Sequence, residues 1–290
     1  MTKSELISVG SGKGGTGKSF FSYLLGKTIA NQGKKTLLFD GDLGCANLHT
    51  LCGLEKPRFS LSDFINNKSS LKEIIVKTPT ENLFLISGAS DSLNVNSLAF
   101  TQKRKLLHHL RCLDFDSIII DVGPDISHNN LDLYSAADYK FLVLNPEQVS
   151  LENCFRYLKA VLLRQFSFSV GIKKSKTLFG EELAAPFQAV NDMHQYISDN
   201  NKEMLGSFRT IFNETEFYLV VNKTLSGQRN VAEDFKNIVA KYLTTNINLL
   251  GEIPFNLQVM DCYSKGTPPD IIPGVNTKVE EIYSIFQNIK

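Results

Sequence analysis

Short runs of apolar and β-branched residues alternate along the chain with longer stretches in which apolar positions recur at helical spacing. Seven runs have the length and composition of strands buried on both faces: 6–9, 36–39, 83–86, 117–120, 139–144, 217–221 and 249–253. Five longer stretches predict helices, near 18–31, 101–112, 151–164, 231–243 and 277–289. Strands that alternate with helices form right-handed βαβ units. The pattern therefore predicts an α/β fold with a doubly wound, mostly parallel sheet.

One interval interrupts this alternation. About 70 residues separate the predicted strand that ends at 144 from the one that begins at 217, more than a crossover needs. The stretch 165–214 is therefore predicted to be a helical insertion within a single domain spanning 1–290. Two interpretations of the insertion stay open, a helical cover for the sheet and a docking segment for a partner. Its apolar positions are Leu178, Phe179, Leu183, Phe187, Val190, Met193, Tyr196 and Ile197.

The composition narrows the class of protein. Lys and Arg number 31 against 30 Asp and Glu, so no global basic field indicates nucleic acid as a partner. No apolar run reaches the length of a membrane span or of a signal peptide. Without a C-x-x-C pair, the cysteines are expected to be reduced thiols, and the protein is expected to be cytoplasmic. The five are Cys45, Cys52, Cys112, Cys154 and Cys262.

A glycine-rich loop lies between the first predicted strand and the first predicted helix. It satisfies G-x-x-x-x-G-K-[ST], the phosphate-binding P-loop, in the strand–loop–helix setting that the motif requires. Glycines let successive backbone N–H groups point at phosphate oxygens, and the helix N-terminus adds partial positive charge. Lys18 is expected to reach the β- and γ-phosphates, and the Ser19 hydroxyl to ligate Mg²⁺. The motif comprises Gly12, Lys13, Gly14, Gly15, Thr16, Gly17, Lys18 and Ser19.

Carboxylates follow two further predicted strands. The second strand ends in Asp40 and Asp42, and the strand at 117–120 ends in Asp121, a Walker B pattern. Carboxylates beside a phosphate site suit Mg²⁺ and the handling of water. Asp121 is expected to hold Mg²⁺ through a water molecule. The alternative for Asp40 and Asp42 is a pair of solvated loop carboxylates that cap the following turn.

Several of these motifs resemble those of the MinD/ParA family of ATPases with a deviant Walker A motif, which belong to the SIMIBI-type P-loop NTPases. The early lysine in Lys-Gly-Gly-x-Gly-Lys-Ser is the family's signature. The segment after the second strand is most similar to switch I of the FlhG and MinD branch. Later segments that match are Asn145-Pro146-Glu147, Asn222-Lys223 and Gly251-Glu252-Ile253-Pro254; the switch I segment is Asp40-Gly41-Asp42-Leu43-Gly44-Cys45-Ala46-Asn47-Leu48.

The resemblance implies roles for individual residues. Lys13 would reach across a dimer interface to the partner's nucleotide, Asp42 would position the attacking water, and Asp40 would lie near the metal. Asn222 and Pro254 would line the base pocket. The implied catalytic set is Asp42, Lys13 and Lys18, and the implied metal set is Ser19, Asp40 and Asp121. Switch II departs from the family, with Asp-Val-Gly-Pro-Asp at 121–125, so its coupling to hydrolysis stays open.

The expected function is that of an ATP-dependent dimerising switch. By resemblance the chain would hydrolyse ATP slowly to ADP and phosphate when a partner stimulates it, and would act in flagellar number, pole or division-site placement. Two alternatives stay open: a nucleotide-binding scaffold that does not hydrolyse ATP, and a ParA-like DNA partition ATPase. The near-zero net charge argues against the DNA-bound form. So does the absence of the Pro-Gln-Gly that usually follows the second Asp in ParA.

The C-terminal stretch bears on membrane binding. Apolar residues recur at helical spacing in 277–290, which predicts one buried face of a last domain helix. The polar side carries Lys278, Glu280, Glu281 and Lys290, which is not the basic face that an anionic membrane attracts. No autonomous membrane binding is expected. A protein partner, docking through 165–214, would deliver the chain to a pole or membrane.

Overall fold

The computed structural model describes residues 4–42, 46–88, 100–179, 190–227, 230–269, 272 and 274–290. Leu183, Phe187 and Cys45, which the sequence analysis singled out, lie outside these ranges, as do residues 43 and 44 of the predicted switch I. Within the described ranges, no helix combines the length and hydropathy that crossing a membrane requires.

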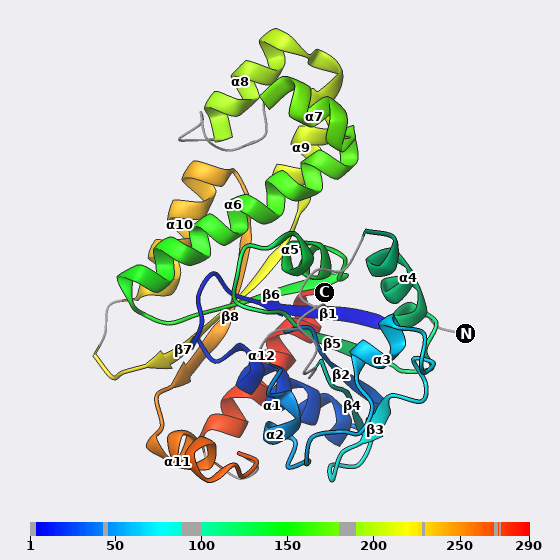
Figure 1. Ribbon diagram of the computed structural model, residues 1–290. Coiled ribbons are helices and arrows are strands. Elements are labelled where there is room, and N and C mark those ends of the chain that lie inside the picture. Colours follow the sequence, from blue (N-terminus) through cyan, green and yellow to red (C-terminus); the bar gives the residue numbers. More distant parts are fainter. Residues whose placement is uncertain are drawn as a thin grey trace.

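Eight strands form one sheet in the order β3-β4-β2-β5-β1-β6-β7-β8 (Figure 1). Every neighbouring pair is parallel except β3 and β4. The predicted doubly wound, mostly parallel sheet is confirmed, and so are the seven predicted strands. The three-residue edge strand β3 was missed because it is too short to show a pattern. The strands are β1 Glu5–Gly10, β2 Thr36–Asp40, β3 Ile75–Lys77, β4 Leu83–Ile86, β5 Ser117–Asp121, β6 Tyr139–Leu144, β7 Phe217–Thr224 and β8 Ile247–Pro254.

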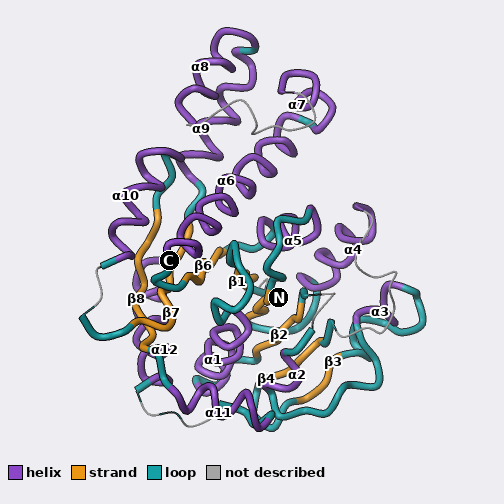
Figure 2. The backbone as a smooth tube through the Cα atoms, turned by 60° about the vertical axis from the view of Figure 1, so that its left-hand side comes forward, coloured by secondary structure: helices purple, strands orange, loops and turns teal. Residues whose placement is uncertain are grey.

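Helices cover both faces of the sheet, as Figures 1 and 2 show. Helices α1 and α12 pack on one face, whereas α4, α5, α6 and α10 pack on the other. The main helices are α1 Lys18–Asn31, α4 Phe100–Arg111, α5 His128–Ser135, α6 Gln148–Val170, α10 Val231–Leu243 and α12 Val275–Ile289. Three short ones are α2 Leu48–Leu51, α3 Leu61–Ile65 and α11 Leu257–Lys265.

The last helix, α12, lies against β8 and α1. Its apolar face is buried in the core beneath the sheet, through Val279, Ile282, Tyr283 and Phe286. Ile289, at the end of the helix, is 44% exposed. The periodicity of this stretch therefore marks a helix whose apolar face packs in the core.

Residues 165–214, which the sequence predicts to be a helical insertion, form a helical tower in their described parts that stands away from the sheet (Figure 1). We use tower for the end of α6 from residue 165, α7 Ile172–Phe179, α8 Val190–Asn200, the 3-10 helix Lys202–Met204 and α9 Leu205–Glu214. Helix α6 was expected to end at 164, but it continues to Val170 because Phe166 and Ser167 are still buried. It ends at Gly171, whose φ of 91° suits a residue without a Cβ.

Candidate functional site

The P-loop connects the end of β1 to the start of α1 and owes its shape to glycines. Gly15 and Gly17 have φ values of 78° and 93°, which residues with a Cβ rarely adopt. Gly12 is needed for space: a Cβ there would lie 2.0 Å from the carbonyl oxygen of Asn153 on α6. At Gly14 and Gly15, in contrast, an added Cβ would meet no atom within 4 Å. The loop is packed at its base and open at its tip.

Lys18 is the first residue of α1 and is 7% exposed. Its Nζ lies 3.4 Å from the carbonyl oxygen of Lys13, so the lysine spans the loop. Burial lowers its pKa, while the nearby Asp121 and Asp42 oppose that change. No side chain caps the N-terminus of α1, which leaves the first N–H groups of the helix for a ligand. A bound phosphate would suit both the lysine and these donors.

Asp40 and Asp121 face each other across the β2–β5 ladder. This follows from parallel strands that end in register at one edge of the sheet, where the Gly41 N–H also donates to the Asp121 carbonyl oxygen at 2.8 Å. Asp40 accepts from the N–H groups of Asp42 at 3.2 Å and Leu48 at 3.1 Å. Asp121 accepts from the Ser22 hydroxyl at 3.0 Å. Both carboxyls are almost fully buried.

The protonation of these carboxyls reflects their burial. Burial raises the pKa of Asp121 to about 6, although the Ser19 hydroxyl, Lys18 and the Ser22 hydroxyl stabilise its charged form. Burial also raises the pKa of Asp40 well above its ordinary value, and the charge of Asp121 adds to the effect. A pair of buried carboxyls this close together favours a bound cation.

The donor set fits Mg²⁺. Ser19 hydrogen-bonds Asp121, and Asp40 lies opposite Asp121 in the sheet register. In the described part of the chain, no three His, Cys, Asp or Glu side chains gather into a metal cage. Mg²⁺ needs no such cage, because it usually takes one or two carboxylates together with water and substrate phosphates. When bound, the ion would neutralise phosphate charge, and Ser19, Asp40 and Asp121 would hold it.

Lys13 points away from its own loop. Its Nζ donates to Glu147 at 2.9 Å, and the two side chains are 35% and 57% exposed. The ion pair lowers the pKa of Glu147. Thr16 lies inside the loop and donates to the Ser11 hydroxyl at 3.1 Å, which in turn donates to the Lys13 carbonyl oxygen at 3.1 Å. The two lysines of the motif are thus placed differently, one in the site and one on its rim.

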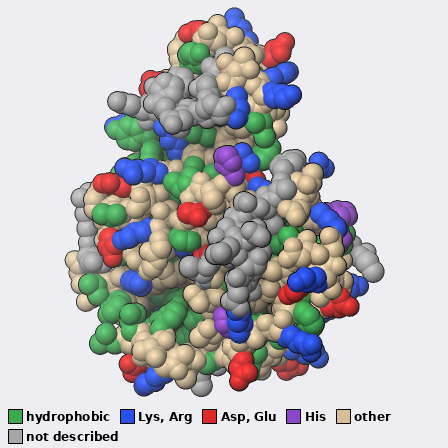
Figure 3. All heavy atoms as spheres, viewed as in Figure 1, with side chains coloured by type: hydrophobic (Ala, Val, Ile, Leu, Met, Phe, Trp, Pro, Cys, Tyr) green, Lys and Arg blue, Asp and Glu red, His purple; other side chains and the backbone are tan. Residues whose placement is uncertain are grey.

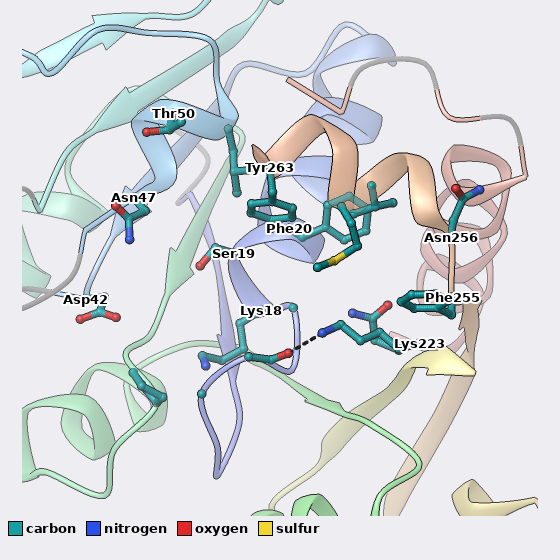
Figure 4. A pocket seen from close by; sticks show the side chains of 18 of the residues that line it. Lys18, Ser19, Phe20, Asp42, Asn47, Thr50, Lys223, Phe255, Asn256 and Tyr263 are labelled. Carbon is teal, nitrogen blue, oxygen red and sulfur yellow. Dashed lines mark hydrogen bonds between the residues drawn. The ribbon is translucent and has the colours of Figure 1, made fainter. Parts of the chain in front are cut away.

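A cavity of about 620 Å³ opens beside the P-loop (Figure 4). Eight of the predicted site residues line it: Gly14, Gly15, Gly17, Lys18, Ser19, Asp42, Asn222 and Pro254. Five others do not: Gly12 is packed against α6, Lys13 is on the rim, Thr16 is inside the loop, Asp121 is buried beside Ser19, and Asp40 is buried opposite Asp121.

The structure gives Lys223 a role that the sequence did not indicate, and it shows a contact between Asn222 and the P-loop. Lys223 donates from its Nζ to the Gly15 carbonyl oxygen at 2.8 Å, and its φ of 61° is unusual for a lysine. Asn222 donates to the Thr16 carbonyl oxygen at 2.8 Å. Together these two hydrogen bonds tie the end of β7 to the P-loop. Helix α11 contributes Val259, Met260 and Tyr263 to the cavity wall.

Comparison with known proteins places the first half of the chain in a family. The sequence profile of a family described as AAA domain matches residues 4–169. The septum site-determining protein MinD of Escherichia coli strain K12 is 33% identical over 158 residues, which are 53% of this chain and 57% of that protein. The match thus spans a little more than half the length of this relative.

Solved structures extend the likeness in fold to nearly the whole chain. MinD of Pyrococcus horikoshii, complexed with Mg-ADP, has a TM-score of 0.65 at 20% identity, covering 97% of this chain and 96% of that one. MinD of Aquifex aeolicus, in a MinC:MinD complex, has a TM-score of 0.65 at 19% identity, with 98% and 96% covered. With the P-loop geometry, these matches show that the chain belongs to the MinD/ParA family of P-loop ATPases.

Proposed function

We propose that this chain is an ATP-dependent switch of the MinD/FlhG type. It binds Mg-ATP in the cavity beside the P-loop and dimerises through that face. It then hydrolyses ATP slowly to ADP and phosphate, and hydrolysis returns it to the monomer. Its output is positional or regulatory, in the placement of flagella, the pole or the division site. The buried lysine, the cation site and the family match support nucleotide binding.

The position of Lys13 carries the proposal of a dimeric switch. A lysine devoted to its own nucleotide would lie in the cavity, as Lys18 does. Lys13 instead reaches Glu147 on the rim, where both side chains are partly exposed. An exposed ion pair contributes little stability, so a better anionic partner displaces it at low cost. The phosphates in a second protomer would be such a partner, which makes nucleotide and dimerisation mutually dependent.

The tower is the proposed docking site for a protein partner. Its stem, α6, is joined to α5 by a bidentate ion pair from Arg164 to Asp132, at 2.7 and 3.1 Å. Lys103 on α4 binds the same carboxylate. Helix α5 begins at His128, a few residues after Asp121 and the predicted switch II. A partner that moves the tower would therefore act on the segment that follows the cation site.

Delivery by a partner also accounts for location without a lipid anchor. The apolar face of α12 is buried in the core, and on its polar side Lys278 forms an ion pair with Glu281 at 2.6 Å. We therefore expect no sedimentation of the described region with anionic liposomes, whether or not ATP is present. Placement at a pole or membrane would then require the partner that binds the tower.

The test measures the oligomeric state and the rate of ATP hydrolysis on the same protein sample. Multi-angle light scattering should show a monomer with ADP and a dimer with a non-hydrolysable ATP analogue, and a phosphate-release assay should show slow turnover of ATP. Lys13→Ala should bind ATP with near-normal affinity in calorimetry but fail to dimerise. Lys173→Ala, on the tower, is the matched control and should behave as wild type.

Two results would contradict the proposal. If the wild-type protein binds ATP and dimerises but releases no phosphate, it is a nucleotide-binding scaffold and not an ATPase switch. A Lys13→Ala variant that loses ATP affinity as severely as it loses dimerisation places that lysine in its own site, and the switch mechanism then fails.

A further inference from the structure

The segment that follows Asp121 forms part of the cavity wall. Val122 and Pro124 line the same cavity as the P-loop, with Gly123 between them. We call the end of the cavity that the P-loop forms its phosphate end. The Val122 N–H donates to the Val9 carbonyl oxygen at 3.0 Å, so β1 holds the first residue of this segment. Beyond it the chain has left the sheet, and its position depends on contacts with α5.

Asp125 and Asn130 join this segment to the first turn of α5. Asn130 donates from its Nδ2 to Asp125 Oδ1 at 2.5 Å, and the Ser127 N–H donates to the same oxygen at 3.0 Å. The Ser127 hydroxyl in turn caps α5 by accepting from the Asn130 N–H at 3.3 Å. Asn130 is only 8% exposed, and hydrogen bonds to a charged acceptor are among the stronger ones. We call the contact between Asp125 and Asn130 the latch.

Gly123 packs directly on the latch. A Cβ at Gly123 would lie 2.7 Å from Nδ2 and 3.2 Å from Oδ1 of Asn130. Because Gly123 does not have a positive φ, the glycine is needed for space and not for backbone conformation. The Asn130 side chain therefore occupies the place that a side chain at 123 would take. It touches the backbone midway between the two residues that line the cavity, so the latch supports the wall by packing as well as by hydrogen bonds.

The helix that carries the latch is itself firmly held. Helix α5 lies against α6, at the foot of the tower in Figure 1, where the tower meets the body of the molecule in the space-filling view of Figure 3. Leu133 is fully buried, and Asp132 binds both Arg164 of α6 and Lys103 of α4. The latch residue Asn130 is two positions from Asp132, so the wall of the cavity is supported by an element that the core and the ion pairs fix.

We propose that Asn130 is a positioning residue for ATP hydrolysis, which holds the wall segment 122–124 in place through Asp125. The proposal rests on the proposed function, because it assumes that ATP is hydrolysed in this cavity. The wall segment lines the cavity together with Asp42, the residue proposed to orient the attacking water. A wall that is free to move leaves the reacting groups less well aligned, which costs rate more than binding. The latch also gives a role to Asp125, the last residue of the stretch 121–125 in which switch II departs from the family.

Exchanging the two groups of the latch tests the pair. Asn130→Asp sets two carboxylates against each other and should slow phosphate release roughly 5- to 50-fold, while calorimetry shows ATP affinity within about threefold of wild type. Asp125→Asn keeps an acceptor but loses the charge, and should slow release by a smaller factor. The double variant restores an amide opposite a carboxylate, and an aspartate suits the first turn of a helix, so it should regain most of the wild-type rate.

Two further measurements make the test specific. Asn129→Asp introduces the same charge one residue earlier on α5, and should release phosphate at the wild-type rate. Hydrogen exchange of peptides that cover 122–127, measured without nucleotide, reads the latch itself, because the Ser127 N–H donates to Asp125. Exchange should be faster in Asn130→Asp and return toward wild type in the double variant. This readout does not depend on ATP hydrolysis.

Each other outcome has one meaning. Unchanged exchange in Asn130→Asp shows that the pair does not hold the segment. Faster exchange with an unchanged rate of phosphate release shows a latch that positions nothing for hydrolysis. A double variant as slow as Asn130→Asp assigns the loss to position 130 alone, and an equal loss of ATP affinity and rate assigns the residue to binding. Each of these overturns the proposal and leaves the proposed function standing. A wild-type protein that binds ATP but releases no phosphate refutes the proposed function, and the positioning role falls with it even if exchange confirms the latch.

Discussion

The phosphate end of the cavity and the tower are built on opposite principles. At the phosphate end, buried charges and glycines lie at the end of a parallel sheet, with Lys18, Asp40 and Asp121 all nearly inaccessible and with Gly12 and Gly17 required by space or by a positive φ. The tower is made of amphipathic helices that pack on one another, as in the stack of Phe208 on Phe212 at 4.4 Å. Most substitutions at the phosphate end should therefore disrupt it. The tower, in contrast, requires only that the positions that pack together stay apolar.

The family match divides the molecule at nearly the same place. It covers residues 4–169, and α6 ends at Val170. The match therefore ends within the first residues of the tower. The wall formed by α11 and the tie from Lys223 to the P-loop also come from beyond the match. Sequence similarity thus covers the P-loop and both buried aspartates, whereas for α11 and most of the tower the likeness to known proteins is one of fold.

The buried ion pairs at the junction between the two regions should be the most sensitive to substitution. Asp132 holds both Arg164 of the tower stem and Lys103 of α4, and all three side chains are at most 15% exposed. Asp132→Asn leaves two buried cations without a counter-charge, which should lower the free energy of unfolding by about 3–5 kcal/mol. Urea denaturation measures this loss.

The matched control for that variant is an exposed ion pair. Lys35 and Asp114 are 3.0 Å apart, but Asp114 is 98% exposed. Asp114→Asn should therefore change the free energy of unfolding by about 0–1 kcal/mol. Losses of similar size in the two variants would mean that the junction does not hold the tower stem against α5.

The second prediction concerns the phosphate end alone. Lys18→Ala removes the buried cation that spans the P-loop, and charged hydrogen bonds of this kind contribute about 1.5–3 kcal/mol. Calorimetry should show ATP affinity weakened by roughly 10- to 150-fold. Lys174→Ala, a tower lysine, should leave ATP affinity unchanged. A Lys18→Ala variant that binds ATP normally would remove this lysine from the site.

Sequence pattern predicted this end of the cavity well for a physical reason. Gly15 and Gly17 have positive φ values and a Cβ at Gly12 would clash with α6, so the backbone of the loop itself demands the glycine spacing that the pattern shows. The meeting of Asp40 with Asp121 also followed from strands that end at one edge. Lys13 with Glu147 was not predictable, because that pair joins two loops far apart in sequence.

The hydrophobic pattern did not predict helices that are short or have no buried face. Helices α2 and α3 have four and five residues, too few to show a period. Helix α11 was missed because it has nine residues, none of them buried, and Val259, Met260 and Tyr263 line the cavity. Periodicity finds faces that are buried in the folded chain, so a helix without a buried residue escapes it.

The third prediction separates binding from turnover at the phosphate end. Asp42 lines the cavity, and its proposed role is to orient the attacking water. A group that acts only on the barrier does not contribute to ground-state binding. Asp42→Ala should therefore bind ATP normally and persist as a dimer in gel filtration, with phosphate release slowed about 10- to 100-fold.

Asp199 on the tower, which accepts from Gln195 at 3.1 Å, provides the control for this variant. Asp199→Ala should release phosphate at the wild-type rate. If Asp42→Ala hydrolyses ATP as fast as wild type, another residue positions the water.

The fourth prediction concerns the ion pair between Lys13 and Glu147 on the rim of the cavity, where we expect a small change in dimerisation. Glu147→Gln keeps a hydrogen-bond acceptor for Lys13 but removes the charge. Exposed ion pairs are worth about 0.2–1 kcal/mol, and a dimer of two protomers would release two of them. Dimerisation with a non-hydrolysable ATP analogue should therefore tighten by about 0.4–2 kcal/mol, roughly 2- to 30-fold, in light scattering across protein concentrations.

Salt and a neighbouring residue sharpen this last test. Because the Lys13–Glu147 pair is partly exposed, high ionic strength screens it and should shrink the difference between wild type and Glu147→Gln. Glu152→Gln is the control, since Glu152 lies one turn further along α6 and bonds only Gln148 among the contacts described, at 3.1 Å. Weaker dimerisation of Glu147→Gln would show that Glu147 belongs to the dimer interface. The ion pair with Glu147 would then not compete with the contact between Lys13 and the second protomer.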